Sequence, residues 1–212
     1  MVHGPGRATL ASLMSTPPNP SFGARPERFP LFPRPAPAAR RLALLDDARP
    51  VDTACAPVVT VWEITLACDL RCRHCGSRAG PRRPDELTTA EALDLVRQLG
   101  ELGCREVALI GGEAYLRPDW TDIIRAVADA GMRCTMTTGG RGIAAERARQ
   151  ARAAGLYSVS VSVDGSRETH DALRHVPGSY DAALAAMRHF QDAGIPTACN
   201  SQVNRLTLHH LD

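Results

Sequence analysis

The chain has 212 residues, of which 44% are hydrophobic, and a formal net charge of +2. This length suffices for one domain with a hydrophobic core, and so small a charge gives no electrostatic reason to expect a nucleic acid or an anionic membrane as a partner. No run of eighteen apolar residues is present, so no transmembrane helix is expected, and the N-terminus lacks the pattern of a secretory signal. Seven cysteines, three of them too close together for a disulfide framework, favour a reducing, cytoplasmic location.

Residues 1–57 differ in composition from the rest of the chain. They contain 11 of the 16 prolines. Proline removes a backbone donor and fixes φ, which excludes regular sheet ladders and long helices. We expect a disordered, Pro-rich N-terminal extension here. The alternative is an extension that docks on the folded part of the chain or captures a partner.

Residues 58–212 alternate between strand and helix patterns. β-rich runs predict strands at 58–66, 106–110, 133–138, 157–164 and 197–203. Helical periodicity, capping residues and terminal glycines predict helices at 89–102, 118–130, 143–154 and 180–193, and a loop with one helical turn at 165–175. In the last helix, Ser179 is the expected cap, with Leu184, Met187 and Phe190 facing inward. Such alternation predicts an α/β fold with a parallel sheet, curled into a barrel or part-barrel, whose functional residues follow the carboxyl ends of the strands.

Three cysteines follow the first predicted strand with the spacing C-x3-C-x2-C: Cys68, Cys72 and Cys75. Thiolates are soft ligands, and iron–sulfur clusters are held by cysteine thiolates, usually four. A [4Fe-4S] cluster held by three cysteines leaves one iron open to a substrate or cofactor. Zinc is the competing interpretation, although the second Cys/His pair that is typical of structural zinc sites does not follow.

Two further motifs accompany the cysteines in the same order along the chain. Gly111-Gly112-Glu113 ends the second strand, and the sequence SVSVDG occupies 160–165 at the fourth. Together with C-x3-C-x2-C, they resemble the radical S-adenosylmethionine (radical SAM) enzymes over roughly 58–212. The resemblance implies an incomplete (βα)6-type barrel, a [4Fe-4S] cluster on the three cysteines and S-adenosylmethionine as cofactor. It leans toward the branch with an auxiliary-cluster (SPASM) domain, which commonly modifies peptides or protein side chains.

The resemblance also implies a role for the Gly-Gly-Glu motif. Gly111 and Gly112 allow a close backbone approach, and Glu113 would receive the methionyl ammonium of the cofactor through a charge-assisted hydrogen bond. Ala114 stands where the family usually has proline. An ordinary strand-to-helix turn is the alternative.

Further cofactor contacts are expected from the later strands. Ser162 and Asp164 share one face of a strand and suit ribose hydroxyls, or else cap the following loop. Arg174 is expected to meet the cofactor carboxylate, or to form a surface ion pair.

Two more contacts follow from the cysteine loop and the last strand. His74 is expected to pack beside the cluster or to lend its backbone to the adenine, and Asn200 and Asn204 to face the cofactor. By contrast, we expect Asp69 to be solvated, and Cys104, Cys134 and Cys199 to lie in the core.

The function implied is reductive cleavage of S-adenosylmethionine, giving a 5′-deoxyadenosyl radical that abstracts hydrogen from a peptide or protein side chain. An electron donor such as flavodoxin or ferredoxin is then required. The sixth βα unit and the cysteine-rich auxiliary domain are missing, so the chain looks truncated. Two alternatives remain: a non-catalytic iron–sulfur or zinc accessory protein, and an inactive fragment of a longer enzyme. A methyltransferase is disfavoured because the cysteines would have no role.

Overall fold

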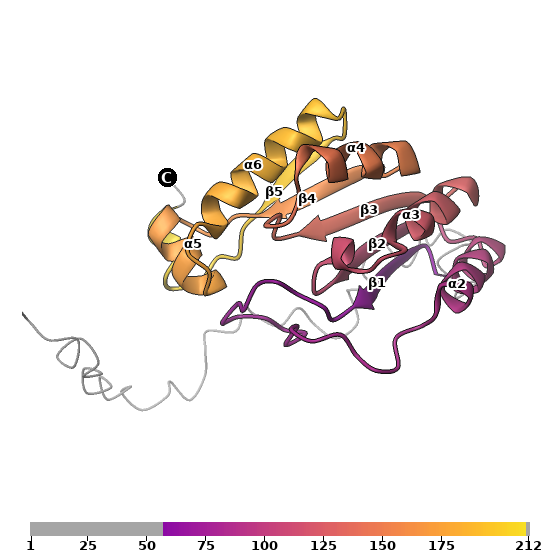
Figure 1. The fold of residues 1–212 in the computed structure, drawn as a ribbon, viewed down its shortest axis with the longest axis horizontal. Coiled ribbons are helices and arrows are strands. Elements are labelled where there is room, and N and C mark those ends of the chain that lie inside the picture. Colours follow the sequence, from indigo (N-terminus) through magenta and orange to yellow (C-terminus); the bar gives the residue numbers. More distant parts are fainter. Residues whose placement is uncertain (1–56, 211–212) are drawn as a thin grey trace, which may run out of the picture. The chain divides into compact units, whose positions relative to one another are not determined.

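The computed structural model describes residues 57–210, so the extension predicted for residues 1–57 lies almost wholly outside them. The five strands are β1 (Val59–Thr65), β2 (Glu106–Gly111), β3 (Arg133–Thr138), β4 (Ser158–Ser162) and β5 (Thr197–Asn200). They form one sheet in the order β1-β2-β3-β4-β5, and each neighbouring pair is parallel (Figure 1). The predicted parallel α/β fold with five strands is therefore confirmed.

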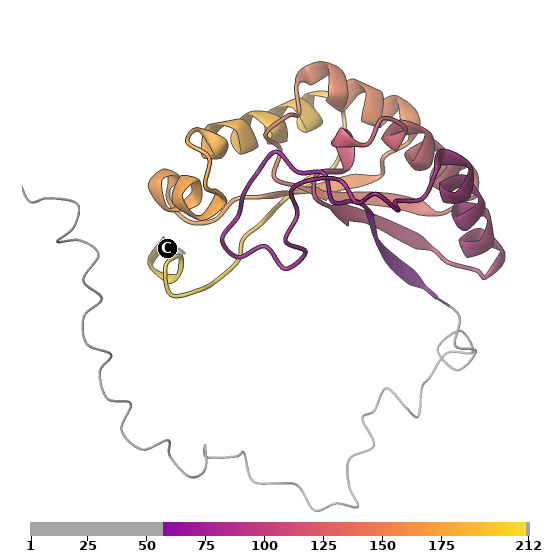
Figure 2. The same cartoon turned by 60° about the horizontal axis from the view of Figure 1, so that its bottom comes forward.

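The helices of this part of the chain are α2 (Thr89–Glu101), α3 (Trp120–Asp129), α4 (Ala145–Ala154), α5 (Arg167–Arg174) and α6 (Ser179–Asp192), with short 3-10 turns η3 (Ala114–Leu116) and η4 (Leu208–His210). Helices α2, α3, α4 and α6 cover one face of the sheet (Figure 2). None of the helices between 57 and 210 is long and apolar enough to cross a membrane.

Alternation along the strands explains this one-sided arrangement. Val107 and Leu109 in β2 and Val161 in β4 are fully buried beneath the helices, whereas Val61 in β1 is 63% exposed. Because successive side chains of a strand point to opposite faces, the first group builds the core with the helices and the second group lines the other face. The apolar side chains that need burial thus gather on one face of the sheet, and the helices cover that face and leave the other one free.

Two predictions for the segment after β4 are wrong. Residues 165–175 contain the eight-residue helix α5, which begins where the Ser166 hydroxyl accepts the N–H of Thr169. Ser179 does not cap α6, because Gly178 is the capping residue and the Ser179 hydroxyl donates to Asp171 at 2.9 Å. Asp171 also accepts two backbone N–H groups there, so a side chain in α5 orders the start of α6.

The buried face of α6 differs in part from the predicted one. Phe190 is fully buried as predicted, together with Ala183 and Ala186. Met187 is partly buried and packs against the core, whereas Leu184 is partly buried and is not one of the residues packed there. Small alanines let α6 pack close to the sheet, so the aromatic ring of Phe190 supplies most of its core volume. Cys104 and Cys134 are buried as predicted, but Cys199 is exposed because β5 is an edge strand.

We predict that Phe190→Ala lowers the free energy of unfolding by about 3–5 kcal/mol, because it leaves a cavity in a fully packed site. Leu184→Ala is the matched control on the same helix and removes a side chain that is only partly buried. Denaturant unfolding of both variants tests the assignment of the inner face. Equal losses for the two would contradict it.

Candidate active site

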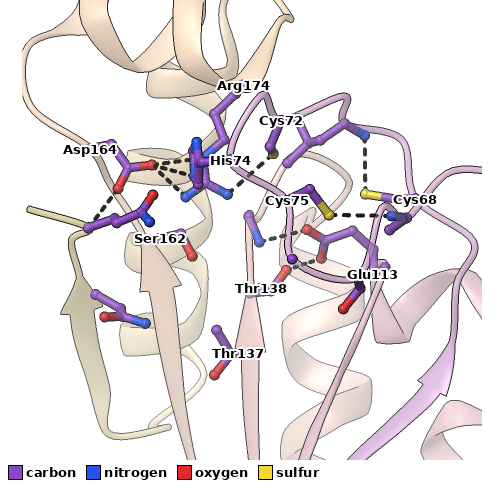
Figure 3. Close-up of a pocket in the computed structure, with 18 of the residues that line it drawn as sticks. Cys68, Cys72, His74, Cys75, Glu113, Thr137, Thr138, Ser162, Asp164 and Arg174 are labelled. Atoms are coloured by element: carbon purple, nitrogen blue, oxygen red, sulfur yellow. Dashed lines mark hydrogen bonds and ion pairs between the residues drawn. The ribbon is translucent and has the colours of Figure 1, made fainter. Parts of the chain in front are cut away.

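A cavity of about 690 Å³ lies at the carboxyl ends of the strands, as expected for this type of fold. Residues that follow or end each of the five strands line it (Figure 3). It brings together nearly all the predicted site residues: Cys68, Cys72, His74, Cys75, Gly111, Gly112, Glu113, Ser162, Asp164, Arg174 and Asn200. Asn204 is not among the lining residues; its side-chain oxygen instead accepts the N–H of Leu206 at 2.8 Å and stabilises a local turn.

The cysteine loop, residues 67–80, is closed at its base by backbone pairing. The N–H of Cys68 donates to Gly80 O and the N–H of Gly80 donates to Leu66 O, both at 2.9 Å. Within the loop each cysteine sulfur accepts one N–H group. The donors are Leu70 N to Cys68 Sγ at 3.4 Å, Ala79 N to Cys75 Sγ at 3.3 Å and Arg174 Nη1 to Cys72 Sγ at 3.6 Å.

This arrangement fits an iron–sulfur cluster. All three cysteines are free thiols that line one cavity, and N–H donors directed at sulfur are the contacts that stabilise and tune metal-bound thiolates.

A tighter group of potential ligand atoms exists, formed by Cys68, Asp69 and Glu113 within 4.8 Å of one another. Both carboxylates already have partners. The oxygens of Asp69 each accept from the Tyr115 hydroxyl at 3.1 Å, and those of Glu113 accept from Thr138 and Gly139. These hydrogen bonds tie the loops together and account for the positions of both carboxylates without a metal ion.

Protonation of the thiols follows from their burial. Burial raises the pKa of Cys68 to about 12, and it also raises the pKa of Cys72, where the Arg174 guanidinium opposes it. Metal binding requires thiolates and therefore releases protons. The N–H donors at each sulfur reduce the cost of that step.

The sequence reasoning missed the anchor of the cysteine loop. Asp69, expected to be solvated, accepts from the buried hydroxyl of Tyr115, which in turn accepts the N–H of Gly142 at 2.9 Å. Arg141 donates to the backbone oxygen of Asp69 at 2.8 Å. These contacts tie the loop after β1 to the segments after β2 and β3. The one indication of this anchor in the sequence is the position of Tyr115, two residues after the Gly-Gly-Glu motif and therefore near the cavity.

The two glycines of the motif allow close contact between backbones. Gly111 has φ +136, and a Cβ on Gly111 or Gly112 would overlap the carbonyl oxygen of Thr65 or Ala67. The N–H groups of Gly112 and Glu113 donate to those same two oxygens at 2.8 and 2.7 Å. The glycines therefore bring the end of β2 against the start of the cysteine loop, so the close approach is to the chain's own backbone.

Glu113 is 2% exposed and lies at the wall of the cavity. Its carboxylate accepts from the hydroxyl of Thr138 and from Gly139 N at 2.6 Å. Burial raises its pKa to about 7, and these two hydrogen bonds only partly oppose the effect. Thr138 ends β3, Gly139 follows it, and both orient the carboxylate, a role that the sequence did not predict for either.

Asp164 and Arg174 form a buried ion pair at the other side of the cavity. Arg174 Nε and Nη2 donate to one oxygen of Asp164 at 3.0 and 2.6 Å, and the two residues are 8% and 0% exposed. His74 Nε2 lies 3.6 Å from the same oxygen (Figure 3). The predicted ion pair of Arg174 is present, although it is buried and not on the surface. Ser162, by contrast, faces the cavity from β4.

The match to known proteins decides the family. The family model described as the radical SAM superfamily matches residues 62–210. The chain belongs to the radical SAM superfamily. The motif-based resemblance is thereby confirmed, and the matched span includes the three cysteines, the Gly-Gly-Glu motif and all of α5.

Curated relatives of this radical SAM chain include an AdoMet-dependent heme synthase and a mycofactocin maturase. An AdoMet-dependent heme synthase of Methanosarcina barkeri is 36% identical over 158 residues, which are 74% of this chain and 45% of the relative. Mycofactocin maturase MftC of Mycobacterium tuberculosis is 34% identical over 140 residues, which are 66% of this chain and 36% of that protein. The chain thus spans less than half the length of either relative.

A solved structure supports the fold independently. SuiB of Streptococcus suis matches with a TM-score of 0.62 at 19% identity, covering 74% of this chain and 36% of SuiB. Crystal structures of SuiB include complexes with S-adenosylmethionine and with the precursor peptide SuiA. At this identity the likeness shows the fold alone.

We predict that ionisation of Glu113 destabilises the cluster-free radical SAM chain. Because the folded-state pKa is raised from 4.5 to about 7, the stability contributed by the protonated form is present below 4.5 and lost as the pH rises through 7. Between pH 5 and pH 8 the wild type should lose about 2–3 kcal/mol relative to Glu113→Gln. Denaturant unfolding at both pH values measures the difference, and a difference that does not change with pH would contradict the assignment.

Proposed function

We propose that this chain carries the cluster- and cofactor-binding half of a radical SAM enzyme. Cys68, Cys72 and Cys75 hold a [4Fe-4S] cluster in the cavity at the carboxyl ends of the strands. When bound, a reduced cluster would supply one electron for the cleavage of S-adenosylmethionine, with methionine and a 5′-deoxyadenosyl radical as the products, and that radical would take hydrogen from the substrate. The observation that carries the proposal is the set of three free thiols around one cavity, each accepting an N–H bond.

Glu113 is the residue we assign to the cofactor's ammonium group. It is buried without an ion pair among the described residues, and a cation placed against it would favour the charged carboxylate. Thr138 and Gly139 hold the carboxylate in one orientation, which reduces the ordering needed when the ammonium binds. Gly111 and Gly112 fix the distance between this carboxylate and the cysteine loop.

The other predicted contacts divide into two groups. Ser162 and Asn200 line the cavity at the ends of β4 and β5 and are assigned to the ribose hydroxyls. Asp164 is unsuited to that role because its carboxylate is already paired with the buried guanidinium of Arg174, and its second oxygen accepts Gln202 N. His74 lines the cavity within the cysteine loop and is assigned to packing against the cluster or the adenine.

For the substrate we propose a peptide or protein side chain. MftC is named as a maturase, and SuiB has been crystallised with a precursor peptide. A porphyrin side chain is the second candidate, because the heme synthase of M. barkeri is 36% identical to this chain. A low-potential donor such as flavodoxin or ferredoxin would supply the electron, in the cytoplasm.

The rival functions are a zinc-stapled or iron–sulfur accessory protein and an inactive fragment. The enzyme, the accessory protein and the inactive fragment would each bind metal at the cysteines. These interpretations differ in which metal is bound and in whether S-adenosylmethionine is cleaved. Metal analysis after anaerobic reconstitution with iron and sulfide separates zinc from a cluster. A chromatographic assay for 5′-deoxyadenosine separates an enzyme from an accessory protein.

We predict that the reconstituted chain forms 5′-deoxyadenosine from S-adenosylmethionine and dithionite. Cys72→Ala should reduce product to the background of cluster-free protein, because it removes one of three ligands. Cys199→Ala is the matched control and should retain activity, since that thiol is exposed on β5, at the opposite edge of the sheet from β1, and does not line the cavity. A cluster that forms without cleavage would favour the accessory or fragment reading, and zinc in place of iron would refute the proposal.

A further inference from the structure

Helix α5 holds the middle of the cysteine loop. The N–H groups of Arg71 and Arg73 donate to the carbonyl oxygens of Arg174 and Leu173, at 3.2 and 2.9 Å. These carbonyl groups belong to the last turn of α5, where helices leave acceptors without internal partners. The residues on both sides of Cys72 are therefore fixed to the end of α5, beside its last side chain.

That last side chain, Arg174, divides its donors between two partners. Nε and Nη2 are used by one oxygen of Asp164, and Nη1 donates to Cys72 Sγ at 3.6 Å (Figure 3). The nitrogens of a guanidinium lie in one rigid plane. Both donors meet the same oxygen of Asp164, and this contact helps to orient the guanidinium with its third nitrogen directed at Cys72.

Asp164 is itself held by two other segments. Its N–H donates to His170 Nδ1 at 3.1 Å, and its second carboxylate oxygen accepts Gln202 N at 2.9 Å. The end of β4, helix α5 and the segment after β5 thus converge on one carboxylate. The direction of Arg174 toward Cys72 follows from contacts within the chain and needs no bound cofactor.

Of the three sulfurs, Cys72 is the one whose donor carries a full positive charge; Cys68 and Cys75 accept from backbone amides. Reduction adds one negative charge to an iron–sulfur cluster. A cation and an N–H bond at a ligand sulfur both stabilise that charge and raise the reduction potential. The guanidinium is also buried, where solvent screens it less than on the surface.

We propose that Arg174 raises the reduction potential of the cluster through the sulfur of Cys72, with Asp164 holding its guanidinium in position. This inference rests on the proposed function, because it requires a cluster on the three cysteines. It gives Arg174 a role distinct from the contact with the cofactor carboxylate that the family resemblance implies. The two roles can be separated experimentally, because the effect on the reduction potential persists when no S-adenosylmethionine is bound, whereas the contact with its carboxylate does not.

The test is the midpoint potential of the reconstituted cluster, titrated anaerobically and followed by electron paramagnetic resonance without S-adenosylmethionine. Arg174→Gln keeps an amide donor and removes the charge. At a fixed potential, the ratio of reduced to oxidised cluster should fall about tenfold, which for one electron is a lowering of about 59 mV. An unchanged potential, with iron and sulfide content equal to that of the wild type, would overturn the inference and leave the proposed function standing.

Two further variants control for charge and for folding. Arg141→Gln removes a positive charge that also contacts the cysteine loop, at Asp69, but is exposed and touches no sulfur. It should shift the potential clearly less than Arg174→Gln; an equal shift would assign the effect to general charge and overturn the inference. If Arg174→Gln takes up no cluster, Arg174→Lys replaces it in the test. We then expect the midpoint potential to fall by less than about 59 mV, and an unchanged midpoint potential would overturn the inference. A wild type that takes up no cluster would instead refute the proposed function.

Discussion

The contact on which the site depends is between two pieces of backbone. Gly112 and Glu113 donate their N–H groups to the carbonyl oxygens of Thr65 and Ala67, and neither glycine of the motif has room for a Cβ. Ala67 is followed directly by Cys68, so the contact sets the first cysteine and the carboxylate of Glu113 on the same wall of the cavity. A parallel sheet brings all strand ends to one edge, but this contact is what brings the loops at that edge within reach of a shared ligand.

The two buried carboxylates of the cavity are stabilised in different ways. Asp164 is paired with Arg174, which donates two hydrogen bonds to one of its oxygens, so the buried charge is compensated. Glu113 has only a hydroxyl and a backbone amide as donors, and burial raises its pKa to about 7, with no ion pair among the described residues to oppose it. A buried carboxylate of this kind gains most from an incoming cation. This difference supports placing the cofactor's ammonium at Glu113 and not at Asp164.

The sequence allowed the sheet, the cysteine motif and most of the cavity wall to be predicted, because these depend on local patterns. β-rich runs and terminal glycines mark the strand and helix limits, and strand ends in a parallel sheet share an edge. Helix α5 was missed because its mean composition is polar and its start depends on one hydroxyl, that of Ser166. The partners of Asp69 and Glu113 could not be predicted, since Tyr115 and Thr138 are joined to them only by the packing of separate loops.

The three sulfur contacts show how far the cysteine motif specifies the chemistry of its metal centre. Two of the N–H donors come from the loop's own backbone, so the turns of any loop with this spacing and conformation would supply them whatever the side chains. The third comes from a side chain 102 residues further along the chain, held by a carboxylate at the end of another strand. A chain could keep every cysteine and lose this donor through one substitution in α5. The motif therefore fixes the ligands, whereas the electronic environment of Cys72 depends on the packing of α5 and on the Asp164–Arg174 pair.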